Sequence, residues 1–338
     1  VDNGLPDNYI NSIYITEDNN IWLATKENGI VRFDGKKFIN YSKESHLVDN
    51  HVNCVMVDSR QQVWCGTRGG ISLLNDKGFF TINEENWELP NNEVQTIIED
   101  KKGNIWAGTL DGLAKFKFED DSMTTFDEEE GLYYKEIYAL AEDADGNIWI
   151  GTNGGGLFKY ETGSQEEQPI KLIADNTILR SVNIVSLVFQ NDSVLLVGTN
   201  IGFDKLILDK KGEIISAKNY YKSNGFIGME NNLNSILKDN KGNIWFGTVK
   251  GITCYKPELE KINTKPPINH LTKLDLRFKN VDWTERADSL YPWTLLPRSL
   301  ILPHSENHLT FKWTGISLSN PENVRYKYKL DPVDKDWS

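Results

Sequence analysis

The stretch Asp143-Ala-Asp-Gly-Asn-Ile-Trp-Ile-Gly-Thr152 decides how this chain is interpreted, because near copies of it recur along most of the sequence. It combines an Asp-x-x-Gly-Asn corner with a β-branched residue, a Trp and a Gly-Thr pair. The Gly tolerates the positive φ of a short hairpin loop, and Ile and Trp are typical strand residues. Each copy therefore predicts a tight turn that leads into a short β-strand.

Five further stretches match this pattern. Four of them keep the Trp, and one degenerate copy has Leu196 in its place. The copies are Asp18 to Thr25, Asp58 to Thr67, Asp100 to Thr109, Asn191 to Thr199 and Asp239 to Thr248. The equivalent residues Trp22, Trp64, Trp106, Trp149, Leu196 and Trp245 are 42, 42, 43, 47 and 49 residues apart. This spacing indicates six repeats.

Each repeat contains four strand-like segments joined by short turns. In the first repeat these are Ile10 to Thr16, Ile21 to Thr25, Gly29 to Phe33 and Lys37 to Ser42. Four short strands per repeat, without helical periodicity, are typical of an all-β protein whose repeats are four-stranded blades of a β-propeller. A β-helix or a leucine-rich solenoid would have a shorter period. The propeller is predicted over residues 1–257.

The number of blades in the ring stays open. Six repeats are visible, but the segment Val1-Asp-Asn-Gly-Leu-Pro6 is similar to the end of a preceding strand. We therefore expect either six blades or a seven-bladed ring that includes an upstream blade.

The repeated residues have a structural explanation in this fold. Blades pack face to face, so the Trp is expected to fill the space between neighbours, and the Gly before Thr to leave room for the next blade's backbone. The corner that begins at Asp143 resembles a calcium loop, but it lacks a bidentate Glu at the required spacing. We interpret it as a turn and predict no metal site.

Composition limits the classes of partner. The chain has 338 residues, 39% of them hydrophobic, and a formal net charge of −12, which argues against nucleic acid as a partner. It contains no apolar run of 18 residues and no charged-then-apolar leader. The three cysteines lie in no zinc-like cluster, and we expect all of them to be buried thiols. Counting from the turn pairs Cys65 with Val55, which places Cys54 on the opposite face.

The pattern stops after Pro257, and a second region follows. Residues 258–269, ending in Pro266-Pro267, are predicted to be a linker. Strand-like runs then occur in 270–338, which we predict to be the N-terminal part of an incomplete immunoglobulin-like β-sandwich that continues past Ser338. The runs are Leu271 to Phe278, Ser299 to Leu302, His308 to Trp313 and Val324 to Leu330.

A ligand is expected at one end of the propeller, where the loop into the first strand and the loop between the second and third strands of each blade meet. Amides and aromatic rings with isolated charges around a central pocket suit hydroxyl-rich ligands such as sugars. The candidate ligand-binding residues there, which differ between blades, are Lys26, Arg68, Tyr134, Tyr138, Arg180 and Asn200. Asn11, Asn53 and Asn234 share one slot in three blades, which favours a bond to the backbone over a ligand contact.

Catalysis is the alternative to binding. The chain has five histidines and no nucleophile elbow, paired-acid motif or metal-ligand spacing, and only His51 is well placed on the predicted loop end. We therefore predict no catalytic residue, no cofactor and no enzyme activity in this segment.

Two sets of motifs resemble a known family. Gly4-Leu-Pro-x-Asn8, followed by Asn-Ser-Ile, Gly-Asn-Ile-Trp-x-Gly-Thr and Gly-Ile-x-x-Phe, is similar to the regulator propeller repeats of bacterial two-component sensors. Asn307 to Trp313 and the Tyr326-Lys-Tyr328-Lys-Leu330 run resemble the triple-tyrosine domain that follows such propellers. Pro332 stands where that domain usually has Gly, and the chain stops before the third tyrosine.

This resemblance implies a function. Such blades form the extracytoplasmic, periplasmic sensor of a hybrid histidine kinase or of a simpler regulator, anchored in the membrane by its parent chain. It implies a homodimer that detects an oligosaccharide, with any kinase domain outside this segment. Two alternatives stay open: a scaffold for protein contacts, and a propeller lyase of the streptogramin-inactivating type, which would need an acid/base residue and magnesium.

Overall fold

The computed structural model describes residues 4–222, 225–228, 230–260, 267–317, 324 and 326–337. It divides into two compact units, Val1–Glu258 and Leu259–Ser338, which are described separately. Residues 261–266, half of the predicted linker and including Pro266, lie outside the described residues.

The first unit consists of six antiparallel sheets in the order of the six repeats, here called blades one to six. Blades one to three contain β1 (Ile10–Ile15), β2 (Ile21–Thr25), β3 (Ile30–Phe33), β4 (Phe38–Tyr41); β5 (Val52–Val57), β6 (Val63–Thr67), β7 (Gly70–Asn75), β8 (Gly78–Ile82); and β9 (Val94–Glu99), β10 (Ile105–Thr109), β11 (Gly112–Lys117), β12 (Ser122–Phe126). Blades four to six contain β13 (Ile137–Glu142), β14 (Ile148–Thr152), β15 (Leu157–Tyr160), β16 (Ile170–Ala174); β17 (Ile184–Asn191), β18 (Val194–Thr199), β19 (Gly202–Leu208), β20 (Ile214–Tyr220); and β21 (Asn231–Lys238), β22 (Ile244–Thr248), β23 (Gly251–Tyr255).

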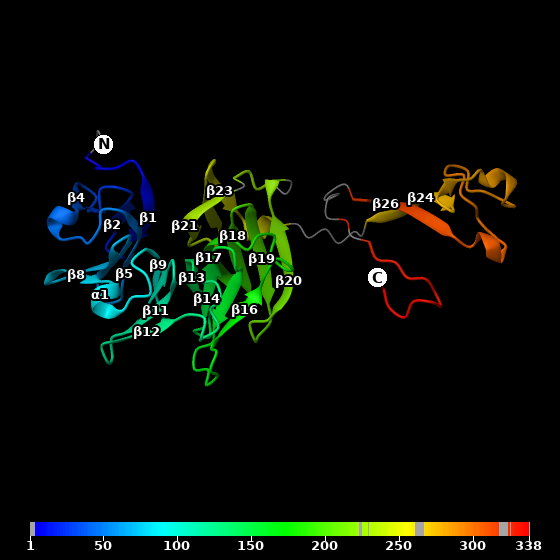
Figure 1. The fold of residues 1–338 in the computed structure, drawn as a ribbon. Helices are drawn as coiled ribbons and strands as arrows, with labels where there is room; N and C mark the ends of the chain where they lie inside the picture. Colours follow the sequence, from blue (N-terminus) through cyan, green and yellow to red (C-terminus); the bar gives the residue numbers. More distant parts are fainter. Residues whose placement is uncertain are drawn as a thin grey trace. The chain divides into compact units, whose positions relative to one another are not determined.

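The blades are arranged as in a propeller. The first strands β1, β5, β9, β13, β17 and β21 contact one another in succession and lie around the centre, whereas the fourth strands lie at the rim (Figure 1). Helices are short: α1 (Glu84–Trp87) and the 3-10 turns Lys43–Ser45 and Pro257–Leu259 are those of the described part of this unit. The prediction of an all-β propeller is therefore confirmed.

The apolar core is divided among the junctions between successive blades. Each of five core clusters combines residues of one blade with those of the next: for example, Trp106 of blade three packs with Ile137 and Phe158 of blade four. The other four clusters join blades one and two, two and three, four and five, and five and six. Trp64, Trp106 and Trp149 are fully buried in these junctions, as the sequence predicts.

The Thr of each Gly-Thr pair closes the hairpin between the second and third strands. Its hydroxyl donates to a glycine carbonyl at the start of the third strand, for example from Thr109 to Gly112 at 2.8 Å. The same bond occurs from Thr25, Thr67, Thr152, Thr199 and Thr248. All six blades, including the degenerate fifth, thus share this element.

The Asp of the corner accepts a hydrogen bond from the indole of the Trp. Asp100 Oδ2 lies 2.9 Å from Trp106 Nε1, and its other oxygen accepts from the backbone N–H groups of Lys102 and Asn104. Equivalent Asp–Trp bonds join Asp58 to Trp64, Asp143 to Trp149 and Asp239 to Trp245. N–H donors therefore hold these carboxylates in the turn.

Two blades depart from the Asp–Trp pair. In blade one the residue six positions before Trp22 is Thr16, so Asp18 is not the equivalent of the other aspartates; it bonds the side chains of Thr16 and Asn20 instead. In blade five Gln190 and Leu196 replace both members of the pair. Leu196 removes the indole donor, so blade five has no indole N–H to pair, and the side-chain oxygen of Gln190 is buried without a hydrogen-bond partner among the described residues.

The Gly before Thr makes room for a side chain and not, as expected, for the backbone of the next blade. A Cβ at Gly151 would lie 2.5 Å from Ile184 Cγ2, and one at Gly108 would lie 2.5 Å from Ile137 Cγ2. Both isoleucines begin the first strand of the following blade. Blade one carries Ala24 at this position.

We expect Gly151→Ala to lower the free energy of unfolding by about 1–3 kcal/mol, because the added methyl group overpacks the junction of blades four and five. Urea denaturation measures the change. Gly151→Ala combined with Ile184→Ala should cost less than the two single changes added together. An unchanged urea midpoint for Gly151→Ala would contradict the assigned role.

Blade six differs from the predicted four-stranded form, since it has three described strands. Its Trp245 is 40% exposed, and Leu237 and Ile252 beside it are also exposed. At the other end of the series, Ile13 and Ile15 of β1 are exposed. These side chains belong to none of the core clusters that the described residues form between successive blades.

The predicted pairing of the cysteines is confirmed for Val55 and Cys65. Cys54 and Cys65 are buried free thiols, and burial raises the pKa of Cys54 to about 12. Cys254 is only half-buried, which corrects the prediction for that residue, because it lies on the face of blade six next to Trp245.

The second unit is built on a small sheet of β24 (Ile268–Leu276), β25 (Lys279–Asn280) and β26 (Leu309–Ile316). Leu274, Leu276, Trp283 and Leu296 form its core, with 3-10 turns at Trp283–Glu285 and His304–Glu306. The predicted strands at Ser299 to Leu302 and, where described, Val324 to Leu330 are absent. Tyr326 and Tyr328 pack near Trp313 instead. The described strands of this unit form a single sheet, and the incomplete immunoglobulin-like sandwich stays a prediction.

Candidate functional site

The loops into the first strands and the loops between second and third strands do lie at one end of the propeller. In several blades the residue after the Thr donates its backbone N–H to a carbonyl just before the first strand, as from Lys26 to Tyr9 at 3.1 Å, from Arg68 to His51 at 3.3 Å and in Leu110, Asn153 and Val249. We call this end the loop face. Its predicted geometry is confirmed.

Arg68 and Tyr138 both lie near Glu93 on the loop face. Arg68 Nε is 3.6 Å from Glu93 Oε1, and Gln95 Nε2 donates to the same oxygen at 3.3 Å. Partial burial, followed by the negative charges of Glu136 and Glu93, raises the pKa of Tyr138. These side chains form a polar set across blades two to four.

His51 lies at the edge of this polar set. Its burial, together with the positive charge of Arg68, lowers the pKa of the imidazole, although Asp49 and Glu93 oppose the shift. The backbone N–H of His51 donates to Asp49 Oδ1 at 2.8 Å. The imidazole therefore favours its neutral form at neutral pH.

Two other predicted residues, Lys26 and Tyr134, contact neighbours near their own loops. Lys26 Nζ lies 5.3 Å from the centre of the Tyr9 ring, and Tyr134 packs on Gly155 and near Phe158.

Arg180 and Asn200 form a second set on the loop face. The Arg180 guanidinium lies 4.0 Å from the centre of the Tyr221 ring, and Ser181 Oγ donates to Asn200 Oδ1 at 2.7 Å. These contacts belong to blade five and the loop after it. The structure thus places Arg68 beside Glu93, whose charge also acts on Tyr138, and places Arg180 and Asn200 in another part of the loop face.

The repeated asparagine slot serves the backbone. Asn11 Nδ2 donates to the carbonyl of Val52 at 2.8 Å, and Asn53 Nδ2 to that of Val94 at 2.9 Å, each on the first strand of the next blade. Asn234 also donates to a carbonyl, but to that of Gln95 in blade three. Strand β21 bulges between Asn231 and Ile236, and Asn234 has a φ of 51°, which redirects its side chain.

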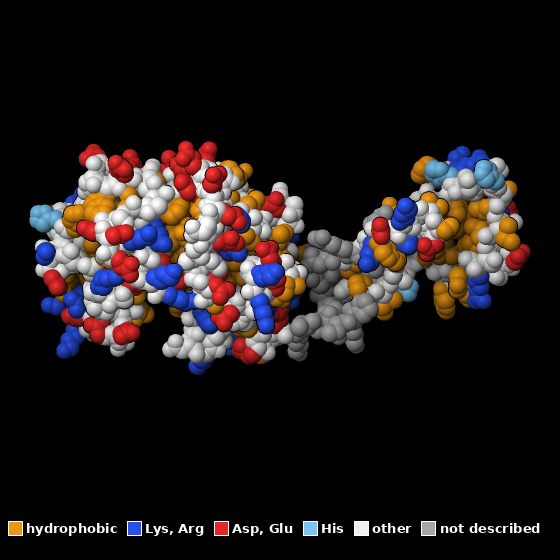
Figure 2. Space-filling view, turned by 90° about the horizontal axis from the view of Figure 1, so that it is seen from below, with side chains coloured by type: hydrophobic (Ala, Val, Ile, Leu, Met, Phe, Trp, Pro, Cys, Tyr) orange, Lys and Arg blue, Asp and Glu red, His pale blue; other side chains and the backbone are white. Residues whose placement is uncertain are grey.

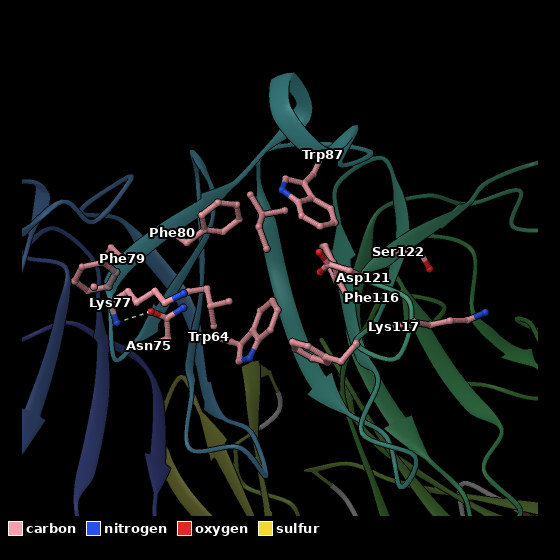
Figure 3. Close-up of a pocket in the computed structure, with 14 residues that line it drawn as sticks. Trp64, Asn75, Lys77, Phe79, Phe80, Trp87, Phe116, Lys117, Asp121 and Ser122 are labelled. Carbon is pink, nitrogen blue, oxygen red and sulfur yellow. Dashed lines mark hydrogen bonds between the residues drawn. The ribbon is translucent and has the colours of Figure 1, made fainter.

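A groove between blades two and three is the feature that the sequence did not reveal. Its cavity volume is about 540 Å³, within the range of about 300–1,000 Å³ typical of small-molecule sites. Aromatic side chains line much of it, as Figure 3 shows, and they are Trp64, Phe79, Phe80, Trp87, Phe116 and Phe118. We call it the aromatic groove.

Polar groups lie at the margin of the aromatic groove. Asn75 ends β7, Lys77 lies in the turn between β7 and β8, and Asp121 lies in the turn between β11 and β12. Lys77 and Asp121 stand on opposite sides of the rings, while Lys117 extends away from them (Figure 3). The groove thus presents a donor, an acceptor and an amide beside ring surfaces.

The wider surface offers few other candidates. On the face seen in Figure 2, acidic and basic side chains of the first unit are interspersed with apolar ones. The described residues include no group of three or more His, Cys, Asp or Glu that could hold a metal ion. Within the same residues, no helix has the length and apolar character needed to span a bilayer.

The comparisons with known proteins identify the repeats. Residues 4–27, 88–111, 134–154 and 228–250 match the family model of the two-component regulator propeller. Each match ends at or just after a Gly-Thr or Ala-Thr pair, so the family pattern coincides with the hairpins described above. No curated protein matches the chain.

Two similar solved structures come from B. thetaiotaomicron. One is named as the extracellular domain of the hybrid two-component system BT3049, with 19% identity and a TM-score of 0.60. The match covers 99% of this chain and 50% of the BT3049 chain. The other, the extracellular domain of the one-component system BT4673, has 22% identity and a TM-score of 0.60. This match covers 99% of this chain and 45% of the BT4673 chain. The chain spans about half the length of these proteins.

An enzyme shares the propeller fold. Virginiamycin B lyase from Staphylococcus aureus is 16% identical with a TM-score of 0.54, and the match covers 75% of this chain and 85% of the lyase. At these identities the similarity shows the fold alone. The chain carries two-component regulator propeller repeats, in an all-β architecture that it shares with the extracellular domains of a hybrid two-component system and of a one-component system.

Proposed function

We propose that this chain is the extracytoplasmic ligand-sensing module of a two-component signalling protein, and that it binds an oligosaccharide without converting it. The observation that carries the proposal is the match of four blades to regulator propeller repeats, together with the similarity of nearly the whole chain to extracellular domains of two-component systems. The chain would face the periplasm, and any kinase domain would lie in another part of the protein.

The loop face supplies groups that suit a sugar. Glu93 forms an ion pair with Arg68 and accepts from Gln95, so that Arg68 is held over the face, and Tyr138 adds a half-buried ring. Arg180 on Tyr221 provides a second cation backed by a ring. Such planar donors and aromatic surfaces match the hydroxyls and the apolar faces of a saccharide. Lys26, Tyr134 and Asn200 would complete the contacts.

Signalling would proceed through a homodimer. A ring whose junctions are closely packed resists internal deformation, so a bound ligand would change the arrangement of two chains and not the shape of one. Any shift in this arrangement requires a difference in ligand affinity between the two states. Membrane anchoring would then be supplied by the parent protein.

Isothermal titration calorimetry of the chain against neutral and acidic oligosaccharides tests this proposal. We expect binding that Arg68→Ala, Tyr138→Ala or Arg180→Ala weakens by roughly tenfold each, since each change removes about 1.4 kcal/mol of contact energy. Lys36→Ala, on an exposed turn of blade one, is the control for loss of a charge. Binding that is unaltered in all three variants would move the site away from the loop face.

One observation favours a second candidate, a scaffold for protein contacts. Trp245, Leu237 and Ile252 leave an apolar face of blade six exposed, which is a property of protein interaction surfaces. Absence of binding to every glycan tested would favour this candidate.

A further inference from the structure

The aromatic groove exists because one position of the repeat differs in blade two. In blades one, three and four, the residue that faces the Trp on the third strand is basic, and its cationic group lies over the indole ring. The pairs are Arg32 with Trp22 at 6.0 Å, Lys115 with Trp106 at 4.6 Å and Lys159 with Trp149 at 5.7 Å. In blade two the facing residue is Leu73, so no cation covers Trp64.

A second departure builds the wall of the groove. Between β8 and the next blade, α1 places Trp87 6.1 Å from Phe116 and 6.4 Å from Phe80, measured between ring centres. Asn83 and Asn86 form a capping box, in which the side-chain oxygen of each accepts from the backbone N–H of the other. Asn86 Nδ2 also donates to the carbonyl of Thr81. The Trp87 ring is therefore held in place before any ligand arrives.

The polar groups of the groove are available. In the part of the chain that the structure describes, no hydrogen bond or ion pair is made by the side-chain ammonium of Lys77 or the carboxylate of Asp121, and the two lie on opposite sides of the rings (Figure 3). Asn75 Oδ1 already accepts from the Lys77 backbone at 2.9 Å, which leaves its NH₂ group as a donor. A molecule in the groove would meet ring faces, two donors and one anionic acceptor.

We propose that the aromatic groove binds a neutral pyranose unit of a saccharide, as a site distinct from the loop face. A pyranose has apolar C–H faces that stack on indole and phenyl rings, and hydroxyls that both accept and donate, which matches Lys77, Asn75 and Asp121. Because the groove pairs one positive with one negative side chain, it favours a neutral sugar over a charged one. This inference rests on the proposed function only for the class of ligand.

The test uses two readouts on the whole chain. Calorimetry with cellotriose, galactotriose and mannotriose reports saccharide binding at any site, and saturation-transfer NMR with methyl glycosides of the same hexoses reports ring contacts. Sorbitol, which has the hydroxyls without a ring, is the control ligand. Trp87→Ala and Asp121→Asn should each weaken the glycoside signal by roughly tenfold. Lys36→Gln, in the equivalent turn of blade one, should leave it unchanged and serves as the match for Lys77→Gln.

Leu73→Lys is the sharpest variant, because it replaces one apolar lining residue with the residue type found in other blades and should cover Trp64 while leaving the aromatic side chains in place. Loss of glycoside binding with an intact fold is the expected result. If glycoside or trisaccharide binding is unchanged in both Leu73→Lys and Trp87→Ala, the proposal that the groove binds a pyranose is wrong, and the proposed function still holds. If the glycoside NMR signal depends on the groove but calorimetry detects no trisaccharide binding, only the proposal of oligosaccharide sensing is wrong. If neither NMR nor calorimetry detects binding, both proposals are wrong.

Discussion

Replacing Trp149 with alanine should lower the free energy of unfolding by about 3–5 kcal/mol, the cost typical of removing a large aromatic side chain from a core. Trp149 is fully buried between blades four and five, with its ring centre 6.0 Å from that of Phe189. Neighbouring blades cannot collapse onto the space, because their strands are fixed by their own hydrogen bonds. Urea denaturation followed by circular dichroism measures the loss.

Trp245→Ala is the matched control for this change. Trp245 occupies the same position of its blade and donates the same indole bond to Asp239 at 2.9 Å, but it is 40% exposed. Its replacement should cost about 1–2 kcal/mol, since less apolar surface is lost. Equal losses for the two variants would show that the indole bond, and not the packing between blades, dominates.

Asp100→Ala should be the second most damaging change, at about 2–4 kcal/mol. The carboxylate accepts from the indole of Trp106, which is fully buried, and from two backbone N–H groups of the turn. Without it the indole N–H is buried and unpaired, and the charged hydrogen bonds are lost. Thermal and urea unfolding of the variant report the effect.

Two controls separate these contributions. Asp209 makes the same two backbone bonds in blade five, with Lys211 and Glu213, but has no indole partner, so Asp209→Ala should cost less than Asp100→Ala. Asp100→Ala with Trp106→Phe should recover part of the loss, because the unpaired donor is removed as well. Failure of the double variant to recover any stability would contradict the assigned role of the indole bond.

The contribution of Asp100 to the stability of the protein should decrease at acidic pH. Burial raises the pKa of Asp100, but the bonds from Trp106, Asn104 and Lys102 outweigh it and leave the pKa below its ordinary value of 3.8. A carboxyl whose pKa is lowered by folding stabilises the protein above the unfolded value and loses this contribution as the pH falls through the folded one. The wild type should therefore lose stability below about pH 4 more steeply than Asp100→Ala.

The repeat made most of the propeller predictable. A Trp every 42 to 49 residues, with Gly-Thr behind it, fixes a hairpin, and the hairpin fixes which loops share an end. The buried Trp side chains and the Val55–Cys65 pair follow from this local pattern. The second unit lacked such a repeat: β24 pairs with β26 across about 40 residues, and short apolar runs such as Ser299 to Leu302 do not determine that register.

The aromatic groove could not be predicted in the same way. It depends on Leu73 facing Trp64 on the neighbouring strand, and on Trp87, in the short helix between β8 and β9, meeting a ring of the next blade. The absence of a cation at position 73 is visible in the sequence only after the pairing register is known. Arg68 and Tyr138 stay predicted ligand-binding residues, and Glu93, which pairs with Arg68, was missed because it follows no repeated pattern.

The division of the core among junctions has a consequence for motion. The bonds that close the hairpins within a blade, such as Thr109 to Gly112, span three or four residues, whereas blades adhere to one another chiefly through apolar contact, with a few hydrogen bonds such as that from Asn11 to Val52. In such nearest-neighbour assemblies, terminal units open without disturbing the middle. Blade six has three described strands and an exposed Trp245, so its amide hydrogens should exchange with solvent fastest. The amides of blades three and four should exchange slowest, because local unfolding would begin at the two ends of the series of blades.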